Sequence, residues 1–338
     1  MDQVTLIAMN TSKHVFTLHG VDERGKVLLR RELRRPQLER FFRQLPATDV
    51  VLEACGGSHH WGRVLMALGH RVRLIPPQYV KPFVKRSKND RIDAAAIAEA
   101  AQRPSMRFVP VKPVEMQAEA MILSVRALLM KQRTQLINAV RGHAAEFGVI
   151  AAKGTQHVAA LLDRVAADPA VPAAAQAMFG ELGAALAQGS ARIAEQDLRL
   201  AALHKRNSLS QQLAEAPSIG PVTGLTLALT VDARQFRSGR HFAAWLGLTP
   251  KQNSTAGKHR LGKISREGNE RLRALLVNGA TAVVKLVDPE KGKGSAWLQA
   301  LVRRRPRKLV AVALANKMAR VVWAMMTSGE AYRRQPAG

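Results

Sequence analysis

The sequence predicts an α/β domain followed by two mostly helical parts. Residues 1–110 alternate between strand and helix patterns, and residues 111–205 carry two long helical patterns. Residues 206–330 are again mostly helical and open on a turn rich in Gly and Pro. We therefore expect three domains, with the boundaries 1–110, 111–205 and 206–330.

The first domain is predicted to have the element order β-β-β-α-β-α-β-α. Strand patterns cover residues 4–9, 14–20, 25–33, 49–55 and 71–77. Helical patterns cover residues 35–45 and 58–70, the second of them capped by Ser58, and a third helix begins at Asp90. A three-stranded meander followed by alternating units favours a mixed sheet with helices on its faces.

The middle domain is predicted to be a pair of helices over residues 114–147 and 175–205. Their apolar residues recur at helical spacing, which fits an antiparallel pair or a dimerising coiled coil, and equally two ordinary core helices. The last domain opens on LAEAPSIGPVTGLTLAL, residues 213–229. This stretch is typical of a helix-hairpin-helix, whose turn amides, here near Gly220, contact a DNA phosphate.

The composition points to a polyanionic partner. The chain has 52 Lys and Arg against 25 Asp and Glu, which gives a formal charge of +27. Nucleic acid would neutralise this excess, and an anionic membrane is the alternative. Aromatic residues make up only 4% of the chain, which argues against a surface that binds bases mainly by stacking.

The same composition predicts an intracellular soluble protein. Cys55 is the only cysteine, so no disulfide within the chain and no all-cysteine zinc site is possible. The first ten residues lack the features of a signal peptide, and no uninterrupted apolar run reaches the roughly 20 residues of a membrane span.

Three carboxylates of the first domain are candidates for a metal site. Glu53 ends a buried strand, and Asp90 and Asp93 lie three residues apart on one helical face. Mg²⁺ would offset their repulsion and could bridge them to phosphate. The alternative is that Asp90 caps the helix and Asp93 interacts with its dipole. The first strand offers Asn10, a neutral oxygen donor.

A serine of the last domain is a candidate nucleophile. Ser254 lies in a turn-like stretch between helices, and cations around it would stabilise negative charge on an attacked phosphorus. The alternative is simple phosphate contact by the hydroxyl. The cations expected to contact nucleic acid are Lys85, Arg86, Lys88, Arg91, Lys251, Lys258, Arg260, Lys263, Arg266, Arg303, Arg304 and Arg305. His59 and His60 are interpreted as cap or surface residues.

Five segments taken together resemble the IS110 family of insertion-sequence transposases, the bridge-RNA-guided recombinases. They are IAMNTSKHVF, VVLEACGG, KNDRIDAAAIAEA, SIGPVTGLTL and FRSGRHFAAWLGLTPKQNSTAGKHRLGKISREGNERLR, in this order. The resemblance covers nearly the whole chain and is weakest over residues 150–205. It implies a RuvC-like domain of the RNase H fold, a coiled-coil linker and a C-terminal transposase domain.

The resemblance also implies roles for particular residues. The family's acidic tetrad falls on Asn10, Glu53, Asp90 and Asp93, which would hold Mg²⁺, and its catalytic serine falls on Ser254. One protomer's acids would face another's serine, so a homo-oligomer, a dimer or a tetramer, is expected. Asn10 stands where the family has Asp, as either a natural inactive copy or an engineered substitution, and is expected to impair catalysis.

The function implied is RNA-guided, site-specific DNA recombination by an insertion sequence, in the bacterial cytoplasm and at the nucleoid. Donor and target DNA and a structured noncoding guide RNA would be the partners, with no membrane involved. One alternative is a Holliday-junction-type nuclease that uses water as nucleophile. The other is an RNA- and DNA-binding protein with weakened catalysis.

Overall fold

The computed structural model describes residues 3–85, 89–255, 258 and 260–333. These divide into two compact units, Met1–Met116 and Gln117–Gly338. The first unit contains a five-stranded mixed sheet, and the second is mostly helical, as the sequence predicts. The division into three domains stays a prediction.

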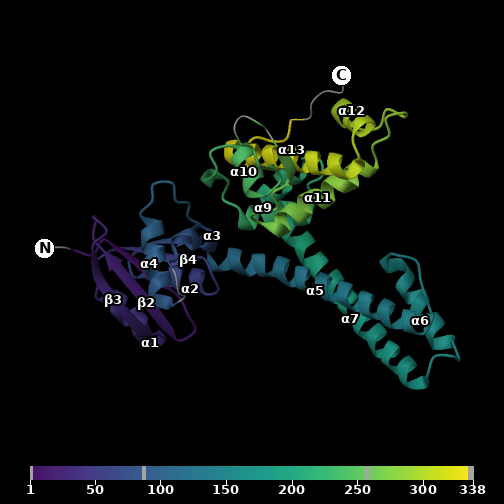
Figure 1. The fold of residues 1–338 in the computed structure, drawn as a ribbon, viewed down its shortest axis with the longest axis horizontal. Helices are drawn as coiled ribbons and strands as arrows, with labels where there is room; N and C mark the ends of the chain where they lie inside the picture. The colour runs from purple at the N-terminus through teal and green to yellow at the C-terminus, as the bar shows by residue number, and fades with distance from the viewer. Residues whose placement is uncertain (1–2, 86–88, 256–257, 259, 334–338) are drawn as a thin grey trace. The chain divides into compact units, whose positions relative to one another are not determined.

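The first unit follows the predicted element order, with an additional short helix and a 3-10 turn between the last strand and the last helix (Figure 1). Its strands are β1 Leu6–Asn10, β2 Val15–Val21, β3 Val27–Arg34, β4 Asp49–Glu53 and β5 Arg71–Ile75. Its helices are α1 Arg35–Arg43, α2 Ser58–Ala67, α3 Pro77–Val80, the 3-10 turn η1 Lys81–Phe83, and α4 Asp90–Ala101. The strand order is β3-β2-β1-β4-β5, with β1, β2 and β3 antiparallel and β1, β4 and β5 parallel.

Alternation along the strands divides this core between two faces. Ile7 and Met9 of β1 pack with α1 and α2, whereas Leu6 and Ala8 pack against the face that carries α4. Figure 1 shows α4 and α1 on opposite sides of the sheet. The last residue of β1, Asn10, has the same parity as Leu6 and Ala8, so its side chain belongs to the α4 face.

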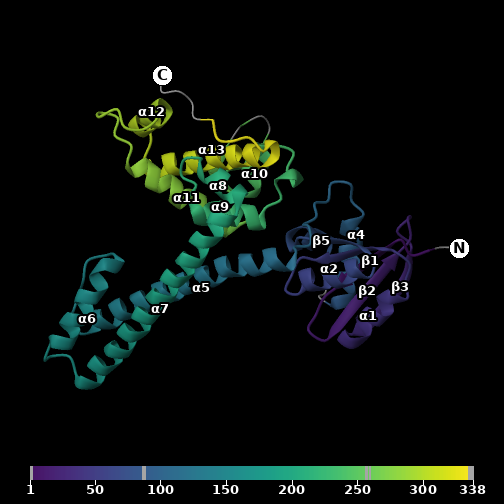
Figure 2. The ribbon, with the colours of Figure 1, turned by 180° about the vertical axis from the view of Figure 1, so that it is seen from behind.

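The second unit begins with a long antiparallel helical pair. Its elements in this part are α5 Val114–Glu146, η2 Thr155–His157, α6 Val158–Ala167 and α7 Ala173–Arg206. Arg126 of α5 forms an ion pair with Asp197 of α7, and farther out Phe147 meets Phe179 at a ring distance of 6.3 Å. These contacts show that α7 returns along α5, with α6 packed at the tip (Figure 2). Supercoiling and dimerisation through this pair stay predictions.

The rest of the second unit is built around its last helix. The elements are α8 Ser208–Ala214, α9 Pro221–Thr230, η3 Ala233–Gln235, α10 Gly239–Trp245, β6 Pro250–Gln252, β7 Leu261–Ile264, α11 Glu270–Lys285, α12 Ala296–Arg304 and α13 Arg307–Ser328. Among the described residues, α13 is also the one helix with the length and apolar composition of a membrane span. Its Leu314, Met318 and Val322 are buried in the core, which accounts for that composition in this fold.

Two details of the expected first domain are corrected. The cap of α2 is Gly57, in a left-handed conformation at φ +89°, whereas Ser58 is the first helical residue. The Ser58 hydroxyl instead donates to the Cys55 carbonyl at 2.9 Å. His59 is half-buried rather than a cap: its Nδ1 accepts a hydrogen bond from the Lys112 N–H at 3.1 Å.

The His59 contact predicts that the stability of the first unit depends on pH in the acidic range. Burial, with the nearby charges of Lys112 and Arg63, lowers the pKa of His59 below 6.5. The stability contributed by the neutral ring is therefore fully present above pH 6.5 and is lost as the pH falls through the lower folded-state pKa. Protonation would also place a proton on the nitrogen that accepts the Lys112 hydrogen bond.

We expect His59→Gln to reduce the acid-dependent part of the unfolding free energy. Denaturant unfolding between about pH 5 and pH 7 should then show a smaller loss of stability on acidification than in the parent. His60→Gln, at the adjacent exposed position, is the matched control and should behave as the parent does. Equal pH dependence for the parent and His59→Gln would contradict the assignment.

Candidate active site

Parallel pairing of β1 and β4 brings two of the predicted site residues to one sheet edge. Met9 is paired with Leu52, so the next residues, Asn10 and Glu53, end neighbouring strands side by side. Glu53 has the same parity as Val51, which packs on the α4 face. Both side chains therefore belong to the same edge and the same face of the sheet.

The start of α4 completes this edge. Asn89 is the N-cap residue, and its side-chain oxygen accepts a hydrogen bond from the Ile92 N–H at 2.9 Å. The capping role considered for Asp90 is thus filled by Asn89. The Asn10 amide instead reaches Asp90, with Nδ2 donating to Oδ1 at 3.1 Å. Asp93, also in the first turn of α4, is half-buried.

The donor types at this edge fit a hard divalent cation, but their spacing is not that of an assembled site. Glu53, Asp90 and Asp93 offer carboxylate oxygens and Asn10 offers an amide oxygen, the ligand types that Mg²⁺ prefers. Within the described part of the chain, no three His, Cys, Asp or Glu side chains are grouped closely enough to hold a metal. The Asn10 amide donates a hydrogen bond to one of the two Asp90 carboxylate oxygens.

The cations predicted to surround these acids differ in exposure and in ion pairing. Lys85 is exposed. Arg91 extends from α4 to β3, where its Nε donates to a Glu32 carboxylate oxygen at 2.8 Å. Arg86 and Lys88 lie outside the described residues. Sequence reasoning missed the charged α4 face of β3, where Arg30 and Glu32 alternate with Arg31 and Leu33.

Ser254 lies in a β-hairpin that the sequence analysis did not anticipate. Strands β6 and β7 pair antiparallel, and Ser254 follows β6 in their connection. Its half-buried hydroxyl accepts a hydrogen bond from the Arg260 backbone N–H at 3.2 Å, and Asn253 N–H donates to the Arg260 carbonyl at 2.9 Å. Backbone contacts across the hairpin therefore position the hydroxyl.

The hairpin is uniformly cationic. The predicted cations Lys251, Lys258, Arg260, Lys263 and Arg266 are all exposed on or beside it. No acidic residue occurs in the sequence from Pro250 to Arg266. An anion near Ser254 would therefore meet positive charge without local competition from carboxylates.

The base of this hairpin is tightly constrained. Ser265 N–H donates to the Thr249 carbonyl at 2.8 Å, and the Arg273 guanidinium donates to the Leu246 and Glu267 carbonyls at 3.0 and 2.8 Å. Gly268 has φ +72°, and an added Cβ would lie only 1.7 Å from the Trp245 carbonyl oxygen. Only glycine fits there, because any side chain would clash with the Trp245 backbone.

The other predicted phosphate contacts are spread over the second unit. Gly220 is exposed at the start of α9 with no side-chain cap, which leaves backbone N–H groups at that end available. Arg303, Arg304 and Arg305 are exposed at the end of α12, although Arg303 also donates to the Pro289 carbonyl at 3.3 Å. A helix-hairpin-helix function for α8 and α9 stays a prediction.

Two family models match this chain over the regions that hold these residues. One, for DEDD transposases of IS110 elements, matches residues 7–148, which include Asn10, Glu53, Asp90 and Asp93. The other, described as "Transposase IS116/IS110/IS902 family", matches residues 210–293, which include Ser254. Full-length relatives agree: the transposase for insertion sequence element IS1111A of Coxiella burnetii is 40% identical over 98% of this chain and 92% of its own length.

The chain belongs to the IS110/IS116 family of insertion-sequence transposases. The y4pF/y4sB protein of Sinorhizobium fredii is 51% identical over 99% of this chain and 87% of its own length. The "Probable family 20 transposase" of Pseudomonas aeruginosa is 48% identical over 97% of this chain and 98% of its own length. The five-stranded mixed sheet fits the RuvC-like domain expected from the family resemblance.

The Asn10–Asp90 contact predicts how this transposase responds to Mg²⁺. In an Asn10→Asp variant the hydrogen bond would give way to two carboxylates at contact distance, a repulsion of about 1 kcal/mol even in a water-like environment. We expect Asn10→Asp to lower the melting temperature without metal and Mg²⁺ to restore it, whereas the parent should respond little.

Thermal melting in EDTA and in millimolar Mg²⁺ measures this difference without requiring activity. Asn10→Ala is the control, because it removes the hydrogen bond without adding a charge. A melting temperature of Asn10→Asp that is unaffected by Mg²⁺ would rule out a cation site at this edge.

Proposed function

We propose that this transposase is an RNA-guided, site-specific DNA recombinase that cuts and rejoins DNA through a phosphoserine link at Ser254. The observation that carries the proposal is the position of Ser254, a hydroxyl in a cationic hairpin free of acids, within a transposase family match. Cations around a reacting phosphate stabilise the charge that develops there. A backbone-positioned hydroxyl is suited to attack from a fixed direction.

Each step of the reaction replaces one phosphodiester bond by another. Ser254 Oγ loses its proton and forms a bond to phosphorus, while a bond from phosphorus to a sugar oxygen breaks and that oxygen takes up a proton. Rejoining is the reverse reaction, with the sugar hydroxyl of another strand displacing Ser254. The Arg260 N–H would hold the Ser254 oxygen, and the side chains of Lys251 and Lys263 would offset charge on the phosphate.

The edge of the sheet would supply the metal-binding half of the site. Glu53, Asp90 and Asp93 would hold Mg²⁺, with Asn10 as a neutral donor. When bound, Mg²⁺ would lower the pKa of an oxygen nucleophile and offset negative charge at phosphorus. Following the family resemblance, the proposal includes a homo-oligomer, a dimer or a tetramer, in which one protomer's acids serve another's serine.

Guidance by RNA would account for the remaining surface charge. The formal charge of +27 favours polyanionic partners, and a structured noncoding RNA would neutralise part of it alongside DNA. Sequence choice would come from base pairing of this guide with donor and target DNA. We place this activity in the cytoplasm, at the nucleoid.

Asn10 favours a second candidate, an RNA- and DNA-binding transposase with weakened catalysis. The site has one negative charge fewer than the family tetrad, and the Asn10 amide competes for Asp90. A Holliday-junction-type nuclease, with water as the nucleophile in place of Ser254, is the other candidate with the same acids. The two variants below distinguish these functions.

Restoring the acid should restore recombination. We expect Asn10→Asp to raise strand exchange between donor and target plasmids by at least roughly tenfold, because a metal-bound carboxylate contributes more than 1.4 kcal/mol to the transition state. Asn10→Ala should give no gain. The assay requires Mg²⁺ and the RNA transcribed from the flanks of the element. No gain with Asn10→Asp would count against the tetrad assignment.

Removing the hydroxyl should abolish the covalent intermediate. In the Asn10→Asp background, Ser254→Ala is expected to reduce both recombination and the protein–DNA adduct to background, as seen by denaturing gel and mass spectrometry. Thr255→Ala removes the neighbouring hydroxyl and should retain the adduct. DNA cleavage that persists in Ser254→Ala would instead indicate a nuclease that uses water.

A further inference from the structure

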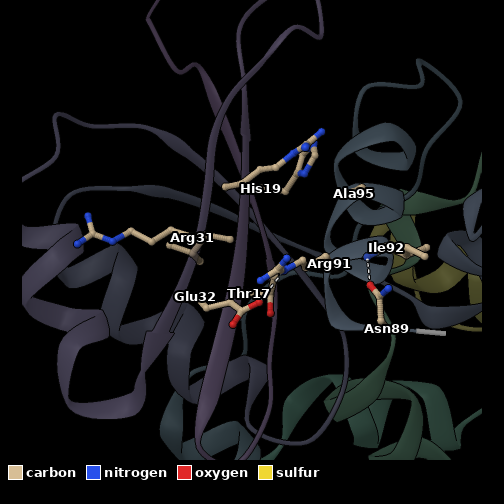
Figure 3. Close-up of a pocket in the computed structure, with 10 residues that line it drawn as sticks. Thr17, His19, Arg31, Glu32, Asn89, Arg91, Ile92 and Ala95 are labelled. Atoms are coloured by element: carbon tan, nitrogen blue, oxygen red, sulfur yellow. Dashed lines mark hydrogen bonds and ion pairs between the residues drawn. The ribbon is translucent and has the colours of Figure 1, made fainter. Parts of the chain in front are cut away.

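Two adjoining hollows lie between α4 and the strands β2 and β3 of the first unit. Their volumes are about 510 and 600 Å³, and both are lined by His19, Arg30 and Ala95. Each is in the size range of protein ligand pockets. Figure 3 shows one of them, with β3 on one side and α4 on the other. We call the two hollows together the α4 groove.

The α4 groove has an excess of positive charge that the protein does not neutralise. Its two acids are already paired: Glu32 with Arg91 at 2.8 Å, and Glu99 with Arg103 at 2.9 Å. The groove is also lined by four exposed cations that have no ion-pair partner among the described residues. They are Arg24, Arg30, Arg31 and Lys85.

His19 adds an unused hydrogen-bonding group to the middle of the groove. It lies directly opposite Arg30 in the β2–β3 register and is only 9% exposed. Within the described chain its ring has no hydrogen-bond partner, and burial together with Arg30 lowers its pKa. A buried neutral imidazole beside a free guanidinium offers two donors to one anion.

The groove leads to the candidate active site. Thr17, which lines it, is the register partner of Asn10 on the adjacent strand. Asn89, which also lines it, directly precedes Asp90 (Figure 3). A chain of phosphates lying in the groove would therefore continue to the edge that holds Asn10 and Asp90.

The lining indicates which part of a nucleic acid fits. Among the described residues that line the two hollows there is no Phe, Tyr or Trp, so they offer no platform on which bases could stack. Arg, Lys and His contacts to phosphate carry no sequence information. Hollows of this size hold part of one strand and are too small for a duplex.

We propose that the α4 groove binds the sugar–phosphate backbone of the DNA strand that is cut, beside the scissile phosphate. The choice of DNA over RNA rests on the proposed function, since the groove ends where that function places the reacting phosphorus. Arg30 and His19 hold one phosphate. Arg91 breaks its ion pair with Glu32 and binds a second phosphate. The groove thus sets the path of the strand, while the guide RNA sets its sequence.

The strand β3 supplies a matched pair of variants for the test. Arg30 and Arg31 both line the groove, but the guanidinium of Arg31 turns to the other face and lies 5.1 Å from the Phe41 ring centre. Figure 3 shows Arg31 directed away from α4. Arg30→Gln and Arg31→Gln therefore make the same change in net charge on opposite faces of one strand.

The experiment measures binding of labelled single-stranded DNA to the full-length parent chain in EDTA at several salt concentrations. Arg30→Gln is expected to weaken binding roughly fivefold and to reduce the slope of log K against log salt by about 0.7, the loss of one phosphate contact. Arg31→Gln should match the parent, and Arg30→Lys should retain the slope. Equal loss in Arg30→Gln and Arg31→Gln, or no loss in either, overturns the proposal.

A second arm distinguishes the two nucleic acids. Single-stranded RNA of the same sequence should show a smaller loss with Arg30→Gln than DNA shows, and a larger loss for RNA overturns the assignment to DNA. Catalysis is not measured, so failure here is separate from failure of the proposed function. Recombination by Asn10→Asp together with unchanged binding in Arg30→Gln would reject the groove alone.

Discussion

The parallel pairing of β1 with β4 is the constraint on which the candidate site depends. It ends two neighbouring strands at one edge, with Asn10 and Glu53 on the face that α4 covers. A slip of one residue would turn either side chain to the opposite face, where α1 and α2 pack. Because Asn89 caps α4, Asp90 is free to meet Asn10, and a 3.1 Å hydrogen bond links these two tetrad positions.

Under the proposed function, the second unit would supply what this edge lacks. The four tetrad positions at this edge are three acids and one amide, and none of them has a hydroxyl group. The β6–β7 hairpin has the Ser254 hydroxyl among cations and contains no carboxylate. In this proposal a divalent cation would offset the repulsion among the acids at the sheet edge, and a DNA phosphate would offset the positive charge of the hairpin. A phosphate bound together with a cation would therefore complement both parts. The α4 groove would add contacts to the phosphates of the same DNA strand on one side of the reacting phosphate.

Sequence patterns predicted the elements of the first unit well, because its buried strands alternate regularly between two faces. They placed Asn10, Glu53 and Asp90 at element ends, which suffices to suggest a shared edge. They did not predict β6 and β7, whose residues are mostly exposed and short of apolar alternation. The α4 groove was not predicted, because it depends on the β2–β3 register, which places His19 opposite Arg30. Helix α6 was not predicted, although its buried Val158, Leu161 and Val165 recur at helical spacing, because the stretch between the two long helices was interpreted as a connection rich in Ala and Pro.

Mixing two inactive proteins tests most directly whether the acids and the serine of different protomers act on one phosphorus. In the Asn10→Asp background, Glu53→Gln keeps Ser254 but loses an acid, and Ser254→Ala keeps the acids but loses the nucleophile. A site shared between protomers predicts that the mixture recovers strand exchange and that the DNA adduct forms only on the Glu53→Gln chains. A mixture as inactive as its two components would contradict a shared site.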